Sequence, residues 1–121
     1  MDINPFFRKE YLTVDEIRSL GSGSAVAVVL GRDEIKEYQY NGKTIKVMFI
    51  DVELSKTKER RPLRLGSAGY PSQACRNLRQ IFGGDTDNWI GKPIELFAVR
   101  YGEDKFTIGV KSYDIDVERL H

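Results

Sequence analysis

The sequence predicts a mainly β domain with two helices, in which five strands form a small barrel and one helix lies between strands three and four. Three observations support this prediction: stretches of alternating apolar and polar residues, two segments with helical spacing, and turn sequences between them. A helix inserted between the strands of a small β domain is typical of a five-stranded, partly open barrel. The 121 residues suffice for one domain with a core and are too few for two.

The first half of the chain is predicted as one helix followed by three strands. Thr13 and Glu16 form a capping-box pattern, which should start a short helix that ends near Leu20. Asn41-Gly42 predicts a tight hairpin, because both residues tolerate positive φ. Alternation of apolar and polar residues predicts the strands, which are expected at residues 25–30 with an extension toward 40, at 43–54 and from 62 to 65.

The second half is predicted as a helix and two strands. Apolar residues recur at three- and four-residue intervals up to Phe82, which predicts a helix over about 71–82 that Gly83 should end. The acidic corner that follows contains the single tryptophan, Trp89, which we expect in the core. Strands are then expected at about 93–101 and 105–111.

The ends of the chain are predicted to lie outside the barrel. Residues 1–12 are expected to form an N-terminal arm anchored by Phe6, Phe7 and Tyr11, and residues 113–121 a C-terminal tail, with the barrel domain over 13–112. The N-terminus has no apolar signal core, and no apolar run approaches the roughly 18 residues that cross a bilayer. A single cysteine excludes an internal disulfide and favours a reducing, cytoplasmic location.

The residue types present argue against an enzyme. Residues 21–24 (Gly-Ser-Gly-Ser) lack the lysine of a phosphate-binding loop. Residues 85–88 resemble the start of a calcium loop, but Leu96 would occupy its last ligand position. Cys75 and the terminal His121 are the only residues of their kinds, so neither a thiolate zinc site nor a nucleophile–histidine pair is expected. We therefore expect no catalytic residue, no metal and no cofactor.

The charge is distributed unevenly although the net charge is only +1. Between residues 56 and 79 the single acid is Glu59, whereas the C-terminal tail is acidic. A nearly neutral protein with this pattern can present one positive face. The bases of the segment are Lys56, Lys58, Arg60, Arg61, Arg64, Arg76 and Arg79.

The corner after the second predicted helix carries a family resemblance. The residues from Phe82 to Leu96 read Phe-Gly-Gly-Asp-Thr-Asp-Asn-Trp-Ile-Gly-Lys-Pro-Ile-Glu-Leu. They resemble the small OB-fold single-stranded-DNA-binding proteins that bacteriophages and prophages encode. The similarity extends over about residues 70–112, and over 13–66 at the level of strand pattern. It implies an OB-like barrel that coats single-stranded DNA during phage replication or recombination in the cytoplasm of a bacterial host.

A DNA site in such a barrel combines positive charge with flat aromatic faces. In an OB fold it lies on strands two and three and on the loops between strands one and two and strands four and five. Phe49 is open to two interpretations. It is an exposed stacking residue if Met48, Ile50 and Val52 form the core face, or a core residue with Ile45 and Val47 if the strand is buried on both sides along its middle. Tyr101 has the same ambiguity, and the other tyrosines could merely brace the hairpin. The predicted DNA-binding residues are Tyr38, Tyr40, Lys43, Lys46, Phe49, Lys56, Lys58, Arg60, Arg61, Arg64, Arg100 and Tyr101.

Two functions are compatible with these patterns. The first is sequence-tolerant binding of single-stranded DNA, with a phage or host replication or recombination protein as a possible further partner. The alternative is an OB-like protein-interaction module, an adaptor or inhibitor that binds no DNA, which the near-neutral charge favours. A homo-oligomer is expected, with a dimer favoured through the N-terminal arm; the arm could equally fold back onto its own barrel.

Overall fold

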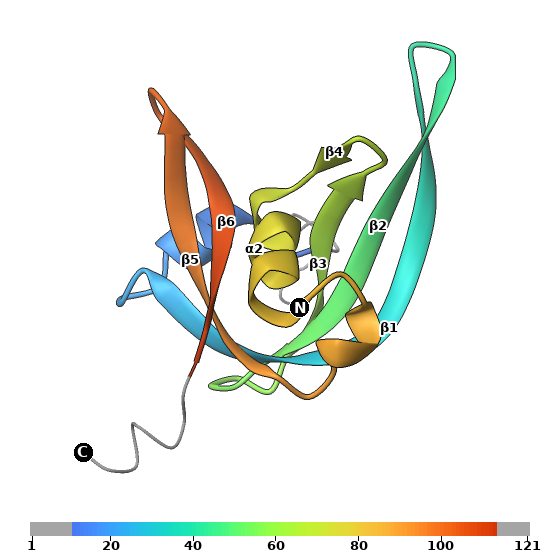
Figure 1. The fold of residues 1–121 in the computed structure, drawn as a ribbon. Coiled ribbons are helices and arrows are strands. Elements are labelled where there is room, and N and C mark those ends of the chain that lie inside the picture. The colour runs from blue at the N-terminus through green and yellow to red at the C-terminus, as the bar shows by residue number, and fades with distance from the viewer. Residues whose placement is uncertain (1–10, 114–121) are drawn as a thin grey trace, which may run out of the picture.

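The computed structural model describes residues 11–113, which form one antiparallel sheet, two α-helices and one 3-10 helix (Figure 1). The elements in chain order are α1 (Val14–Arg18), β1 (Ser24–Tyr40), β2 (Lys43–Leu54), β3 (Arg60–Ser67), β4 (Tyr70–Pro71), α2 (Gln73–Phe82), η2 (Thr86–Asn88), β5 (Pro93–Gly102) and β6 (Lys105–Ser112). Within residues 11–113, no helix is long and apolar enough to cross a membrane. Phe6, Phe7 and the tail after Tyr113 lie outside the described residues.

The strand order in the sheet is β4-β3-β2-β1-β5-β6. β1 pairs with β2 from Ala27 to Tyr40, but it pairs with β5 only over Ser24–Val28. In Figure 1 the sheet curves into a U, with the β1–β2 hairpin on one side, the β5–β6 hairpin on the other and α2 between them. The two hairpins are therefore joined by one short ladder at the base of the U.

The prediction of a mainly β domain with two helices is confirmed, whereas the sheet has six strands rather than five. The additional strand is β4, which consists of two residues and pairs with the end of β3. β2 has the predicted bounds. β1 is continuous to Tyr40 because Gly31, with a φ of 92°, accommodates a bulge at which the register with β2 shifts.

The predicted turns and caps largely form. Asn41 and Gly42 both have positive φ, as a two-residue hairpin turn requires. The Thr13 side chain accepts a hydrogen bond from the backbone N–H of Glu16 and caps α1, which ends at Arg18 rather than near Leu20. α2 starts at Gln73 instead of 71, because Pro71 belongs to β4 and the side chain of Ser72 caps the helix.

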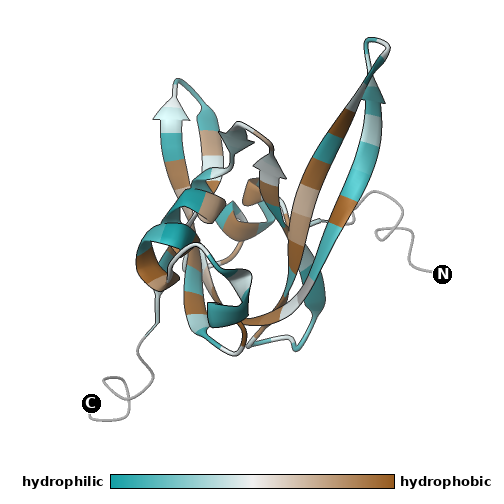
Figure 2. Ribbon diagram, turned by 45° about the vertical axis from the view of Figure 1, so that its right-hand side comes forward, coloured by the Kyte–Doolittle hydropathy of each residue, from teal (hydrophilic) through white to brown (hydrophobic). Residues whose placement is uncertain are grey.

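The core lies on the concave side of the sheet. Apolar and polar positions alternate along the strands in Figure 2, and the apolar positions pack against α1 and α2. Trp89 is buried as predicted, and its Nε1 donates a hydrogen bond to the Gly83 carbonyl, 2.8 Å away. Leu12, which we assigned to the arm, packs in the core, so the domain begins before the predicted boundary. The core includes Leu12, Ile17, Ala27, Val29, Ile50, Val52, Leu63, Leu65, Ala74, Leu78, Trp89, Ile94, Leu96, Ile108 and Val110.

Helix α2 occupies the gap between the edges of β3 and β6. On the β3 side, the backbone N–H of Ser72 donates to the Leu65 carbonyl and its hydroxyl donates to the Arg64 carbonyl, both at 3.0 Å. On the β6 side, the backbone N–H of Val110 donates to Oδ1 of Asn77, also at 3.0 Å. The helix thus satisfies polar groups on both edges, and these strands need not pair with each other.

Candidate nucleic-acid interface

One face of the sheet carries aromatic and basic side chains and lies opposite the core. Directly paired residues of an antiparallel sheet point to the same side, so the register identifies the members of each face. Tyr38 pairs with Ile45, and Phe49 pairs with both Glu34 and Arg64. We call this surface the outer face and define it by Glu34, Lys36, Tyr38, Tyr40, Lys43, Ile45, Val47, Phe49, Arg64, Ser67 and Tyr70.

Three tyrosines of the outer face are accessible to a ligand. Tyr38 and Tyr40 share this face, as their even spacing predicted, and are 43% and 65% exposed. Tyr70 is 79% exposed and lies on the same face, because it pairs with Ser67, which in turn pairs with Val47. Sequence reasoning missed Tyr70, since a two-residue strand has no periodicity by which to recognise it.

Phe49 is buried, so the interpretation as an exposed stacking residue is wrong. Its side chain is only 2% exposed although it points away from the core residue Ile50. Tyr11 covers it, with the ring centroids 5.6 Å apart, and Nζ of Lys36 lies 5.7 Å from the Phe49 centroid. The other interpretation, that β2 is buried on both sides along its middle, is confirmed. Tyr11, beside Phe49, is a second aromatic residue that the predicted site lacked.

The charges of the outer face are mainly positive. Lys43 follows the hairpin turn beside Tyr40, and Arg64 is exposed on β3 beside Phe49. Lys36 lies between these two positions, and Glu34 is the acid among the residues that define the face. Positive charges around accessible rings are the combination that single-stranded nucleic acids require.

Arg61 does not belong to this face, and its predicted DNA contact is wrong. Its guanidinium is buried at the core side of β3 and donates to both carboxylate oxygens of Glu16, at 2.6 and 2.9 Å. It also donates to Glu59 at 3.2 Å and to the Tyr11 carbonyl at 3.1 Å. Burial alone would lower the Arg61 pKa, because it disfavours the charged form. The hydrogen bonds and negative charges of Glu16, and to a smaller extent of Glu59, have the opposite and larger combined effect, so the pKa is raised above its ordinary value. Arg61 therefore holds α1 against β3.

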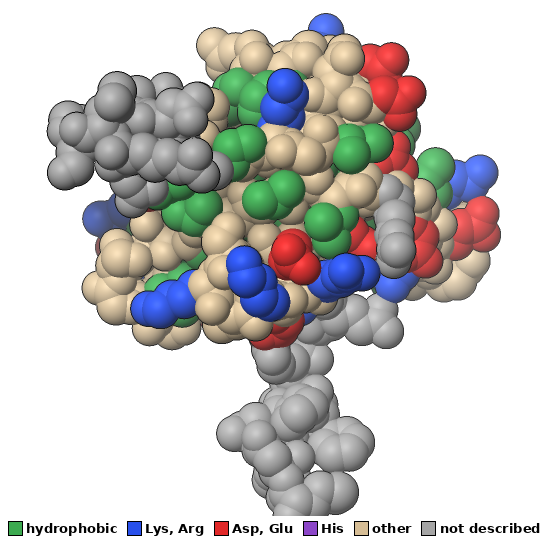
Figure 3. Space-filling model, turned by 90° about the horizontal axis from the view of Figure 1, so that it is seen from below, with side chains coloured by type: hydrophobic (Ala, Val, Ile, Leu, Met, Phe, Trp, Pro, Cys, Tyr) green, Lys and Arg blue, Asp and Glu red, His purple; other side chains and the backbone are tan. Residues whose placement is uncertain are grey.

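Lys56 and Lys58 lie in the loop after β2, as predicted, but that loop does not adjoin Tyr38 and Tyr40. They lie in the turn between β2 and β3, at the opposite end of β2 from the hairpin tip. Twelve strand residues at ~3.3 Å each separate the two ends by roughly 40 Å. In Figure 3, which views the molecule from this lower end, basic side chains lie beside acidic ones.

Lys46 and Arg60 also lie away from the tyrosines. Lys46 belongs to the core-side face of the hairpin, where its Nζ is 3.9 Å from a carboxylate oxygen of Glu37. Arg60 starts β3 at the lower end of the sheet, and its Nε is 3.7 Å from a carboxylate oxygen of Glu53. Ion pairs this exposed contribute little to stability and can exchange for other partners.

Arg100 and Tyr101 form a separate exposed group near the tip of the β5–β6 hairpin. Tyr101 is exposed, and Nε of Arg100 donates to the Gly102 carbonyl at 3.1 Å. Figure 1 places this hairpin across the U from the β1–β2 hairpin. The β1–β2 and β5–β6 hairpin loops, both expected at the DNA site, thus lie on opposite sides of the molecule.

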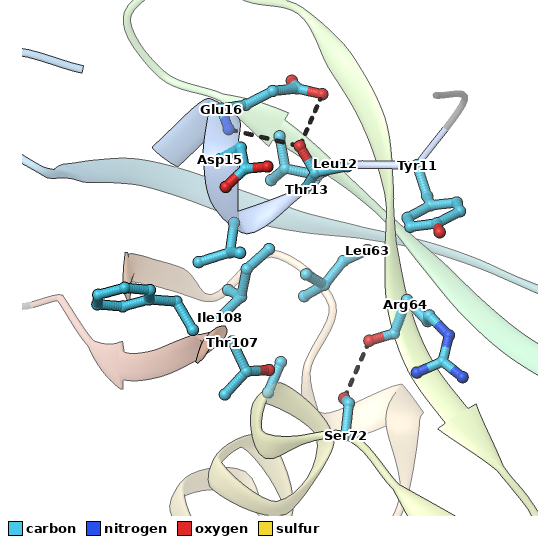
Figure 4. A pocket seen from close by; sticks show the side chains of 13 residues that line it. Tyr11, Leu12, Thr13, Asp15, Glu16, Leu63, Arg64, Ser72, Thr107 and Ile108 are labelled. Atoms are coloured by element: carbon cyan, nitrogen blue, oxygen red, sulfur yellow. Dashed lines mark hydrogen bonds between the residues drawn. The ribbon is translucent and has the colours of Figure 1, made fainter. Parts of the chain in front are cut away.

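A cavity of about 490 Å³ lies between β3, β6, α1 and the start of α2 (Figure 4). Leu63 and Ile108 are among its apolar lining residues. Two of its polar lining side chains donate hydrogen bonds: Thr13 to the Glu16 carboxylate, and Ser72 to the Arg64 backbone carbonyl. No described side chain has a buried polar atom without a partner.

The described residues also offer little reactive chemistry. Burial raises the pKa of the Cys75 thiol, against a smaller opposing effect of Arg79, so the thiol stays protonated near neutral pH. Residues 11–113 contain no group of three or more histidine, cysteine, aspartate or glutamate side chains that could hold a metal ion.

Comparison with known proteins adds no family assignment. No family model matches the chain, and neither a curated protein nor a solved structure does so. The resemblance described from the sequence remains a prediction.

Proposed function

We propose that this protein binds single-stranded DNA on its outer face, without sequence preference and without chemical change to the DNA. The observation that carries the proposal is the gathering of Tyr38, Tyr40 and Tyr70 with Lys43 and Arg64 on one side of the sheet. Phosphates would be neutralised by the cations, while bases stack on the rings.

An OB-like, partly open barrel is the architecture that we propose for the domain. β1 pairs with both β2 and β5, and α2 lies between the long strands β3 and β5 in the chain. The OB fold is a five-stranded, partly open barrel that binds oligonucleotides on strands two and three and on the adjoining hairpin loops. The outer face occupies the corresponding strands, β2 and β3, and the β1–β2 hairpin.

Stacking should account for a measurable part of the affinity. Replacing Tyr38 or Tyr40 by alanine is expected to weaken oligonucleotide binding by about 1–3 kcal/mol, and replacement by phenylalanine much less, because the ring face carries the interaction. Ile35→Ala is the matched control: Ile35 is exposed on the same strand but on the other face. Fluorescence titration of a labelled thirty-mer tests this, and wild-type affinity in a folded Tyr38→Ala, Tyr40→Ala protein would remove these residues from the site.

The salt dependence of binding should identify the cations. Each phosphate contact on a single strand contributes about −0.7 to the slope of log affinity against log salt concentration. The double variant Lys43→Gln, Arg64→Gln is therefore expected to flatten this slope by about 1.4. Lys56→Gln, Lys58→Gln removes the same charge at the far end of β2 and should leave the slope unchanged. Equal slopes for the two double variants would contradict the proposed face.

A protein-interaction module is the second candidate, and one observation favours it. Ile35 and Met48 are exposed and directly paired on the core-side face of the β1–β2 hairpin, beyond the core. Exposed apolar pairs of this kind are used in contacts between proteins. If this is the principal role, DNA affinity will be weak in the wild type and Ile35→Ala will disrupt partner binding.

The biological setting follows from the same proposal. We propose a role in phage replication or recombination in the cytoplasm of a bacterial host, with a homo-oligomer as the active form. A replication or recombination protein remains a possible further partner.

A further inference from the structure

One edge of β1 lacks a strand partner among residues 11–113. β5 pairs with Ser24–Val28, and Val29 exchanges hydrogen bonds with the residues just before β5: it donates to the Lys92 carbonyl at 3.1 Å and accepts from the Gly91 N–H at 2.7 Å. Beyond the bulge at Gly31, β1 continues to Tyr40 and pairs with β2 alone. Thr86 donates to the Asp33 side chain near the start of this edge, at 2.6 Å. A strand edge of this length that lacks a strand partner is a template for another strand.

The hairpin turn determines which backbone groups point out from this edge. In a two-residue turn, the carbonyl of Tyr40 accepts from the N–H of Lys43. Hydrogen bonding alternates along an antiparallel strand, and the register is unbroken from Glu34 to Tyr40. The N–H and C=O groups of even-numbered residues therefore bond to β2, and those of Ile35, Glu37 and Gln39 point outward.

We propose that β1 of a second copy of this chain pairs antiparallel with this edge, on a two-fold axis at Tyr38. A two-fold axis perpendicular to the sheet keeps both outer faces on the same side, and the two copies contact through the same residues. Because directly opposed residues share a face, such an axis must lie midway between one residue of the strand and its own copy. The charges on β1 decide which residue that is.

Three of the possible axes oppose like charges. An axis at Ile35 places Asp33 of one copy opposite Glu37 of the other. An axis at Lys36 places Lys36 opposite its own copy, and an axis at Glu37 places Glu37 opposite its own copy. Like charges directly opposite each other destabilise a sheet. These registers are therefore disfavoured.

An axis at Tyr38 avoids this conflict. It pairs Tyr38 with its own copy and Lys36 with Tyr40, both favourable combinations on adjacent strands. Glu37 and Gln39, whose backbone groups point outward, then exchange hydrogen bonds across the interface. An axis at Gln39 would instead pair strand residues with residues of the hairpin turn. Fewer backbone hydrogen bonds would then form between the two copies than with the axis at Tyr38. The charges and the alternation thus agree on one register.

The pairing has a consequence for the proposed DNA site. Both outer faces would lie on one side of a continuous sheet, and the partner copy would add its own tyrosines and lysines beside the first set. This consequence rests on the proposed function, whereas the pairing itself does not depend on DNA. The tests therefore use the protein without DNA, so that each proposal can fail alone.

Single cysteines test the register. In a Cys75→Ala background, Tyr38→Cys should form a disulfide-linked dimer under mild oxidation, because non-hydrogen-bonded partners have Cα atoms about 4.5 Å apart, within disulfide range. Lys36→Cys is the matched control on the same face, since its two copies would be separated by four residues, roughly 14 Å. Preferential cross-linking of Lys36→Cys or Glu37→Cys, or none at Tyr38→Cys, would overturn the proposal.

The mass in solution tests the edge itself. Proline at residue 37 removes an outward N–H and leaves the pairing with β2 intact. Glu37→Pro should therefore halve the mass measured by light scattering, whereas Glu37→Gln should retain the dimer mass. A monomeric wild type, or a folded Glu37→Pro protein of unchanged mass, would show that this edge does not pair. If Glu37→Pro fails to fold, the cysteine experiment decides.

Discussion

Replacing Arg61 by alanine should lower the free energy of unfolding by about 3 kcal/mol. The substitution removes four hydrogen bonds of the guanidinium and leaves Glu16 and Glu59 without their shared partner. Breaking a buried ion pair costs about 3–5 kcal/mol, and the lower end applies because both glutamates are partly exposed. Urea denaturation measures the loss.

The neighbouring arginine provides the control for this experiment. Arg60 is exposed and its contact with Glu53 is 3.7 Å long, so Arg60→Ala should change stability by less than about 0.5 kcal/mol. DNA affinity of the folded fraction should be the same for Arg61→Ala and the wild type. Similar stability of the two variants, or weaker DNA binding by folded Arg61→Ala, would contradict the structural role of Arg61.

Gly66→Ala should be at least as disruptive, with an expected loss of about 4 kcal/mol. Gly66 has a φ of 104°, which costs other residues about 1–3 kcal/mol. A Cβ at this position would also overlap the Tyr70 carbonyl and lie 2.8 Å from the Ser72 nitrogen. Both are backbone atoms and cannot turn away, so the substitution would force β4 from β3 at a further cost of about 1–3 kcal/mol.

A substitution at Gly69 distinguishes the cost of positive φ from the cost of steric overlap. Gly69 too has positive φ, at 79°, but a Cβ there would meet no atom within 4 Å. Gly69→Ala should therefore cost only about 1 kcal/mol, the conformational part alone. Thermal unfolding of both variants measures the difference. Equal losses would mean that the close approach of β4 to Gly66 contributes nothing.

The sequence predicts features of this molecule that depend on near neighbours in the chain. The bounds of β2 follow from alternation, the turn at Asn41-Gly42 from backbone conformation, and the shared face of Tyr38 and Tyr40 from their even spacing. The burial of Trp89 was also predictable. The strand bounds, the turn and the shared face each depend on at most a few adjacent residues.

Features that depend on distant segments could not be predicted. Phe49 is covered by Tyr11, and Arg61 reaches Glu16; both contacts join residues far apart in the sequence. The run of bases between residues 56 and 79 did not predict where each base lies in the sheet, for a related reason. Because successive turns of an antiparallel sheet lie at alternate ends, Lys58 stands far from the hairpin tip although it follows closely in sequence. Composition alone does not show which end a charge occupies.

The short ladder between Ser24–Val28 and Pro93–Phe97 bears on how fast the chain can fold. The β1–β2 and β5–β6 hairpins each close within a few residues, and hairpins of this kind form in microseconds. The ladder must instead join two segments with most of the chain between them, and closing so long a loop loses conformational entropy before any contact offsets it. We therefore expect both hairpins to form early and the meeting of β1 with β5 to limit the folding rate.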